Sequence, residues 1–378
     1  GKSPRMSRPC PRRTSTRPGT LSVFRALTEF ARHYGPWLTT LENNDRIGIV
    51  VSHRQIKVDQ WGGIGGQYFT RLWEAYMNCL YARQPATFLY PEDQPDLRRF
   101  NALLVVGQRY EIDPPLAALL ARAKKQGITI FADGTCRESL VKDFTPLGVA
   151  FDKIEKLHGF NNDVAWWDFP DALLATAPTV ARALTAVAPV AECDQPEVLL
   201  SERRQADSRF IWVVNNTSPK LEPGQLWRVQ SAIATRPPVV ANVKVPVKKG
   251  EVVYDVFSGK PVSAAFAADL HYSHARLYAV LPRTIQALDL RAPKKLKPGQ
   301  TFQWTASVPG IKAKLPVQLV LHDGTGAVIE ERFTTTGTGT FTVPVNATAP
   351  VTLTATELVS GTSAGATYPT RDVKPVNV

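Results

Sequence analysis

Apolar and polar positions follow two different periods along the chain, and the change falls near residue 196. Before it, short apolar runs alternate with longer segments whose apolar residues recur at helical spacing. The predicted strands cover 46–52, 86–90, 101–107 and 128–132, with a further short strand expected within 144–151. The predicted helices cover 21–41, 68–81, 115–126 and 172–188. This alternation predicts a flavodoxin- or amidotransferase-like α/β domain over 21–195, a parallel sheet with helices on both faces. Its first helix is expected to be a linker, interrupted near Gly35 and Pro36.

After residue 196, apolar and polar residues alternate in short runs that are separated by Asn, Gly, Pro and Ser turn signals. Such runs predict an antiparallel β-sandwich over 196–284. A second series of short strands predicts a small immunoglobulin-like β-sandwich over 285–360, although the Cys…Trp…Cys signature of such domains is absent. Residues 361–378 are expected to form a tail. The predicted fold class is therefore α/β plus all-β.

The net charge of +12 is concentrated at the beginning of the chain. Residues 1–20 hold six basic residues, no acidic ones and almost no apolar ones, which predicts a disordered basic segment. Two interpretations remain open: an arm that binds nucleic acid or an anionic surface, and a linker, which we favour. The rest of the chain has no basic stripe interleaved with aromatic residues, so we do not expect a nucleic-acid partner.

Several other classes of site are disfavoured by the sequence. The four cysteines are widely spaced, which fits neither a disulfide framework nor a metal site, and we expect no metal and no cofactor. His271 and His274 precede a strand, where side chains three residues apart point to opposite faces. The chain has neither an apolar run long enough to cross a membrane nor the apolar core of a signal peptide. We therefore expect no membrane partner.

A cluster of glycines precedes helix 68–81 and follows Trp61; its members are Gly62, Gly63, Gly65 and Gly66. Their backbone N–H groups could cradle a phosphate. However, a dinucleotide fingerprint needs its glycines directly after the strand, and a P-loop needs Lys followed by Ser or Thr, and neither condition is met. We favour a surface loop and keep Trp61 and these glycines as candidates for ligand binding.

Asp133 and Cys136 follow strand 128–132, where α/β enzymes place a nucleophile on a sharp turn. Class I glutamine amidotransferases put their catalytic Cys on such an elbow between two glycines, but Glu138 takes one of those positions here. A thiol nucleophile also needs a histidine, and His158 does not begin the expected His-x-Glu pattern. Cys136 is thus either the nucleophile of an amidotransferase-like or other hydrolase, or a small residue in a tight turn. Asp133 is either a ligand-binding residue or a helix N-cap.

Several segments together carry a resemblance to a known family: 45–52, 68–76, 101–107 and 125–131, with the loop at Trp61 between the first two. Residues 41–156 resemble the β-galactosidase trimerisation domain, the amidotransferase-like middle domain of family 42 glycoside hydrolases. Segments 253–259 and 277–282 resemble the last strands of the β-sandwich that follows this domain in the family. Three departures are the lack of a counterpart to the family's catalytic barrel, the added immunoglobulin-like region and the unusually glycine-rich loop at 61–66.

The resemblance implies a non-catalytic accessory region of a carbohydrate-active protein, which assembles into a homo-oligomer such as a trimer. Helix 21–41 would then join an upstream barrel to the α/β domain. Carbohydrate is the expected ligand, and Trp61 would line a sugar cleft of a neighbouring copy. Trp166 and Trp167 are further candidates for sugar contacts, with core packing as the alternative. The compartment is left open, although immunoglobulin-like modules favour an extracytoplasmic site.

Overall fold

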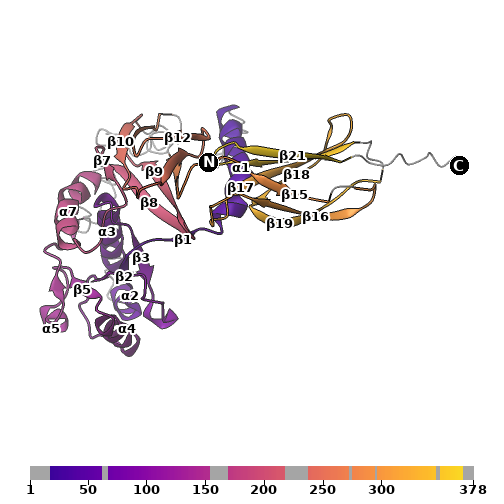
Figure 1. The fold of residues 1–378 in the computed structure, drawn as a ribbon. Helices are drawn as coiled ribbons and strands as arrows, with labels where there is room; N and C mark the ends of the chain where they lie inside the picture. Colours follow the sequence, from indigo (N-terminus) through magenta and orange to yellow (C-terminus); the bar gives the residue numbers. More distant parts are fainter. Residues whose placement is uncertain are drawn as a thin grey trace, which may run out of the picture.

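The fold was analysed in a computed structural model, which describes residues 18–61, 67–153, 169–217, 237–271, 275–293, 296–345 and 350–368. It contains a parallel sheet near the beginning of the chain and several antiparallel sheets after it. In Figure 1 the α/β part, the central sheets and the terminal strands follow one another through the molecule. The α1 helix (Pro18–Leu38) lies where the central sheets meet the terminal strands. The protein thus combines an α/β domain with sandwich-like β structure.

The parallel sheet has five strands in the order β3-β2-β4-β5-β6. Their bounds are Ile47–Val50 for β2, Ala86–Leu89 for β3, Ala102–Val105 for β4, Thr129–Ala132 for β5 and Thr145–Pro146 for β6. Numbered along this domain, the order is second, first, third, fourth, fifth, which is common among doubly wound sheets. The first strand therefore lies between the second and third, and the carboxyl ends of all five strands meet at one edge.

Helices cover both faces of this sheet, because its strands are apolar on both sides. On one face α3 (Gln67–Tyr81) and α7 (Phe169–Ala183) pack over residues such as Ile49 and Leu104. On the other face α4 (Pro114–Lys125) packs over Leu103 and Val105. Three shorter helices lie in the connections: α2 (His53–Trp61), the 3₁₀ helix η1 (Pro91–Asp93) and α5 (Glu138–Val141).

The α4 helix illustrates how the sequence sets element ends. Asp113 accepts a hydrogen bond from the backbone N–H of Leu116 at 3.1 Å, and Pro114 occupies the first helical position, where no N–H is needed. At the other end Gly127 has a φ of 72°, the left-handed conformation in which helices commonly stop.

A six-stranded antiparallel sheet follows, in the order β1-β8-β9-β14-β11-β12. Its strands are β1 (Glu42–Asn43), β8 (Val198–Gln205), β9 (Ser208–Asn215), β14 (Ala275–Leu281), β11 (Val252–Asp255) and β12 (Lys260–Val262). A three-stranded sheet of β13 (Ala265–Asp269), β10 (Val240–Lys244) and β7 (Glu192–Cys193) shares a core with one face of it. We call the larger of the two the central sheet.

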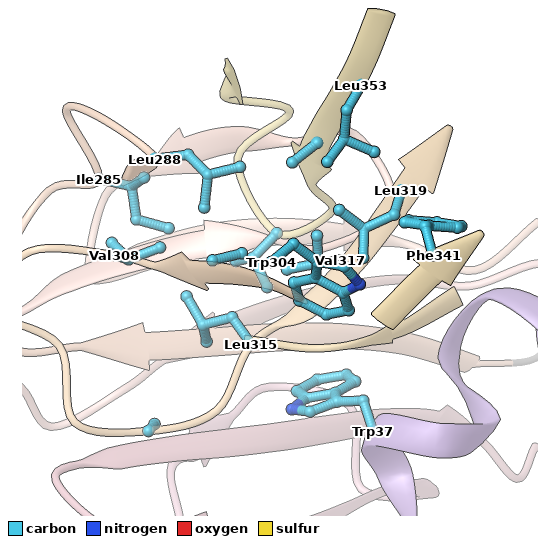
Figure 2. Packing of buried hydrophobic residues seen from close by; sticks show 14 of the residues in the cluster. Trp37, Ile285, Leu288, Trp304, Val308, Leu315, Val317, Leu319, Phe341 and Leu353 are labelled. Carbon is cyan, nitrogen blue, oxygen red and sulfur yellow. The ribbon is translucent and has the colours of Figure 1, made fainter. Parts of the chain in front are cut away.

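The last part of the chain forms two further antiparallel sheets, which we call the terminal sandwich. One sheet contains β15 (Asp289–Arg291), β16 (Thr301–Ser307) and β19 (Gly337–Thr342). The other contains β18 (Val328–Thr335), β17 (Pro316–His322), β20 (Val351–Glu357) and β21 (Ser363–Tyr368). Both sheets contribute side chains to one core, among them Trp304, Leu319 and Leu353 (Figure 2).

The core of the terminal sandwich continues into the second face of the central sheet, and α1 closes the junction. Trp37 on α1 is fully buried, and its ring meets that of Phe210 on β9 edge-on, with centroids 4.9 Å apart. Its indole Nε1 donates a hydrogen bond to the carbonyl oxygen of Lys314 at 2.9 Å, just before β17. Figure 2 shows Trp37 beside Leu315 and below Trp304. One side chain therefore contacts both the central sheet and the terminal sandwich.

The structure differs from the sequence predictions in three elements. The α1 helix runs from residue 18 to 38 without a break, because Pro36 lies in its last turn, where losing one hydrogen bond is tolerated. Residues 363–368, predicted to belong to a tail, form β21 and pair with β20. The strand predicted within 144–151 is limited to β6. The predictions for residues 1–17 and for Trp166 and Trp167 lie outside the described residues.

A pair of glycines in the terminal sandwich gives a test of its packing. Gly339 on β19 lies opposite Trp304, and a Cβ there would be 2.7 Å from Trp304 Cε2. Gly339→Ala should therefore lower the free energy of unfolding by about 1–3 kcal/mol through overpacking. Gly365→Ala on β21 is the control, since its Cβ would approach no atom closer than 3.8 Å. Urea denaturation measures both, and equal losses in the two variants would contradict this packing.

Candidate functional site

The predicted site lies at the carboxyl edge of the parallel sheet, where Asp133 directly follows β5. Asp133 is only 3% exposed, and its carboxylate accepts hydrogen bonds from three loops. Oδ1 accepts from the N–H of Gly107 at 2.9 Å, after β4. Oδ2 accepts from the N–H of Thr135 and the N–H of Phe151, each at 3.0 Å. Asp133 thus ties together the loops that follow β4, β5 and β6.

This role differs from the N-cap considered for Asp133 in the sequence. The α5 helix begins at Glu138, its cap position is Arg137, and no side chain caps it. The Thr135 N–H is local, but those of Gly107 and Phe151 come from residues far from Asp133 in the chain, so only the folded sheet brings them to it. Because the Thr135 hydroxyl also donates to Oδ2 at 2.6 Å, the carboxylate has most of its acceptor capacity filled by the protein.

Cys136 is held by the same loops with its proton on the sulfur. Its Sγ lies 3.2 Å from Asp133 Oδ1 and 3.4 Å from the carbonyl oxygen of Val105, both of which are acceptors. Burial, followed by the negative charge of Asp133, raises the pKa of the Cys136 thiol well above its usual value. Among the described residues no histidine hydrogen-bonds to Cys136. A nucleophilic cysteine needs the opposite environment, one that stabilises the thiolate.

A cavity of about 570 Å³ opens beside these two residues, at the ends of β5 and β6. Its wall is largely apolar and includes Val141, Phe144 and Val149, with Glu138 and Lys142 as charged groups. The volume is sufficient for a small ligand. Since Asp133 and Cys136 already form hydrogen bonds within the protein, they would contribute to the shape of the cavity more than to polar contacts with such a ligand.

The structure brings Asp133 and Cys136 together and leaves the other predicted residues untested. Trp61 is the last residue of α2, and its side chain is outside the description. Gly62, Gly63, Gly65, Gly66, Trp166 and Trp167 lie outside the described residues. Of the histidine pair, His274 is also outside, while His271 Nδ1 lies 2.6 Å from Asp269 Oδ1 in an exposed pair. In the described ranges no three His, Cys, Asp or Glu residues are grouped as metal ligands would be.

Two aromatic residues of α3 lie outside the face that packs on the sheet. The side chains that pack on the sheet are those of Tyr68, Leu72, Ala75 and Cys79. Phe69 is 48% exposed and Trp73 is 39% exposed, one helical turn apart on the outer side. The relevant signal was in the sequence, because the apolar stripe of this helix is wider than one buried face requires.

Exposed aromatic residues are concentrated in the α/β domain. Among the described large apolar residues, Phe69, Trp73, Tyr90 and Tyr110 are exposed there, whereas the exposed ones in the β region are valines. Tyr90 and Tyr110 follow β3 and β4 at the carboxyl edge. No described helix is long and apolar enough to cross a membrane.

No protein-family model matches the sequence, and no curated protein does. Among solved structures, the chain is similar to a β-galactosidase from Bacillus circulans sp. alkalophilus, with 10% identity and a TM-score of 0.45 over 68% of this chain and 45% of that one. A β-galactosidase from the psychrophilic Marinomonas ef1 has 10% identity and a TM-score of 0.32, covering 68% of this chain and 41% of that one. An exo-carrageenase of glycoside hydrolase family 42 from Bacteroides ovatus has 10% identity and a TM-score of 0.34, covering 63% of this chain and 29% of that one. The chain spans less than half the length of these three proteins.

The state of Cys136 can be tested by alkylation. In the folded protein iodoacetamide should label Cys136 at least about tenfold more slowly at pH 8 than it labels a free cysteine, because the raised pKa lowers the thiolate fraction. The rate should continue to rise with pH beyond the ordinary cysteine range. Mass spectrometry of the peptide containing Cys136 measures this, with the unfolded chain as the control. Labelling that already reaches its plateau below pH 7 would contradict a protonated thiol and support the hydrolase alternative.

Proposed function

We propose that this chain is a self-associating accessory region of a carbohydrate-active protein, in which the α/β domain provides the contact between copies. The proposal includes the finer fold assignment, a flavodoxin- or amidotransferase-like domain followed by a β-sandwich and an immunoglobulin-like domain. Support comes from the resemblance carried by segments 45–52, 68–76, 101–107 and 125–131 to a trimerisation domain. The strand order of the parallel sheet is compatible with that assignment.

The observation that carries the proposal is the exposed pair Phe69 and Trp73 on α3. Aromatic residues are enriched in the buried centres of protein interfaces, where charged residues are depleted. The chain carries a net charge of +12, so its copies repel one another, and an uncharged aromatic contact is a favourable place for them to meet. A second copy of the chain is therefore the proposed occupant of this face, and a trimer is the assembly that the resemblance implies.

A contribution to sugar binding belongs to the same proposal. Trp61 and the glycines after it would line a sugar cleft completed by a neighbouring copy, and Trp166 and Trp167 would add aromatic faces. Tyr90 and Tyr110 support this placement, because they are exposed at the carboxyl edge, next to the connection in which Trp61 lies. Asp133 is a weaker candidate than the aromatic residues, since its oxygens are already used by the loops.

The alternative function, a hydrolase that uses Cys136, has no comparable support. Its mechanism requires a base that removes the thiol proton. The groups around Sγ in the described structure are a carboxylate, a carbonyl oxygen and a backbone N–H. The carboxylate disfavours the thiolate by charge repulsion.

Light scattering coupled to gel filtration tests the self-association. At tens of micromolar the protein should be an oligomer, and Phe69→Ser combined with Trp73→Ser should weaken association by at least about tenfold, since truncated aromatic anchors commonly cost more than 1 kcal/mol. The matched control is Val345→Ser, which removes another apolar side chain that is 79% exposed and outside the α/β domain.

The possible results separate the parts of the proposal. A strictly monomeric wild-type protein at these concentrations would refute self-association. An oligomer that persists in the double variant would refute the α3 face as the contact. Circular dichroism of the double variant must match the wild type, because both side chains are exposed and their loss should leave the fold intact.

A further inference from the structure

A second cavity, unrelated to the carboxyl edge, lies between the α/β domain and the central sheet. Its volume is about 420 Å³, which is within the usual range for small-molecule sites, and such sites are frequent at domain interfaces. From the α/β domain it is lined by residues just before β2, β3 and β4, which places it at the amino edge of the parallel sheet. From the other side it is lined by residues of β8 and β9. We call it the interdomain cleft.

One wall of the interdomain cleft is a fixed polar network around Glu202, which is 6% exposed. Arg209 Nη1 lies 3.4 Å from Glu202 Oε2, and Arg209 Nη2 lies 3.0 Å from Glu251 Oε2. Asn44 Nδ2 also donates to Glu202 Oε1, so this carboxylate is bound from both domains. Arg209 is therefore paired with two carboxylates of the protein, and this network forms one wall of the cleft.

Two further guanidinium groups line the interdomain cleft without an equivalent partner. The side chain of Arg204 is 45% exposed, and its Nε lies 3.5 Å from the Glu202 carboxylate that Arg209 and Asn44 already share. Arg46 Nη1 donates to the carbonyl oxygen of Arg99 at 3.1 Å, a neutral acceptor. In the described part of the chain no carboxylate pairs with Arg46. Three guanidinium groups therefore line a cavity that contains one carboxylate.

This arrangement is suited to an oxyanion. A guanidinium presents its N–H groups in a planar fork that matches carboxylate and phosphate oxygens, and charge-assisted hydrogen bonds of this kind are roughly twice as strong as neutral ones. Asn101 lines the same cavity and adds an amide. The partial burial of the cleft reduces the screening of these charges by water.

We propose that the interdomain cleft binds a small molecule that carries an oxyanion group, either a carboxylate or a phosphate, between Arg46 and Arg204. The ligand would contact the α/β domain through Arg46 and the central sheet through Arg204. It would therefore stabilise the contact between the two parts of the chain. This proposal is independent of self-association and of the sugar cleft.

Isothermal titration calorimetry and thermal unfolding of the full chain test the proposal. The probes are inorganic phosphate, inorganic sulfate and glucuronate, each compared with sodium chloride at the same ionic strength. At least one oxyanion should bind and raise the unfolding temperature beyond the chloride control, because a ligand that binds only the folded state stabilises it. Comparison of phosphate with glucuronate distinguishes the two sources of the oxyanion.

Two variants and a control locate the binding. Arg46→Gln and Arg204→Gln should each weaken binding by tenfold or more, while Arg182→Gln, on the exposed side of α7, should leave it unchanged. If Arg46→Gln unfolds the protein, the Arg204 variant still tests the site, since the Arg204 side chain is almost half exposed. The proposal is overturned if none of the three anions exceeds the chloride control, or if the effect is unchanged in Arg204→Gln.

Discussion

The packing of the central sheet against the terminal sandwich depends on one tryptophan. Trp37 is completely buried between Phe210 of the central sheet and the segment that leads into β17, and its N–H is satisfied by the Lys314 carbonyl. A buried indole contributes a large apolar area, and its single donor must find a partner there. The chain continues from α1 into β1 and then into β2, so this junction lies directly before the α/β domain in the sequence.

Within this frame the two edges of the parallel sheet have different chemistry. At the carboxyl edge Asp133 uses its acceptor capacity to hold three loops, while burial and the charge of Asp133 raise the pKa of Cys136. At the amino edge arginines outnumber carboxylates in a cleft shared with the central sheet. The outer face of α3 carries exposed aromatic side chains instead of charges. These surfaces favour binding and association as the roles of the domain, in agreement with the proposed accessory function.

The sequence predicted the α/β elements well because their periodicity is strong. The predicted strands 46–52 and 101–107 contain β2 and β4, and helix 68–81 coincides with α3 to within one residue. It missed β21, since the inward residues Ala364 and Ala366 are too small to give an apolar signal. It did not show that Phe69 and Trp73 lie outside the buried face of α3, because helical spacing does not indicate how wide the covered face is. The bonds of Asp133 and the interdomain cleft join residues distant in sequence, so no local pattern encodes them.

Hydrogen–deuterium exchange of the Trp37→Ala variant tests most directly whether this residue joins the two β regions. Amide protection should fall together in β9 of the central sheet and in β17 of the terminal sandwich, while β2 and β4 of the α/β domain should keep theirs. Leu27→Ala on the same helix is the control, because Leu27 is 58% exposed and its loss should change protection in neither region. Loss of protection confined to β9 or to β17 alone would contradict a shared core centred on Trp37.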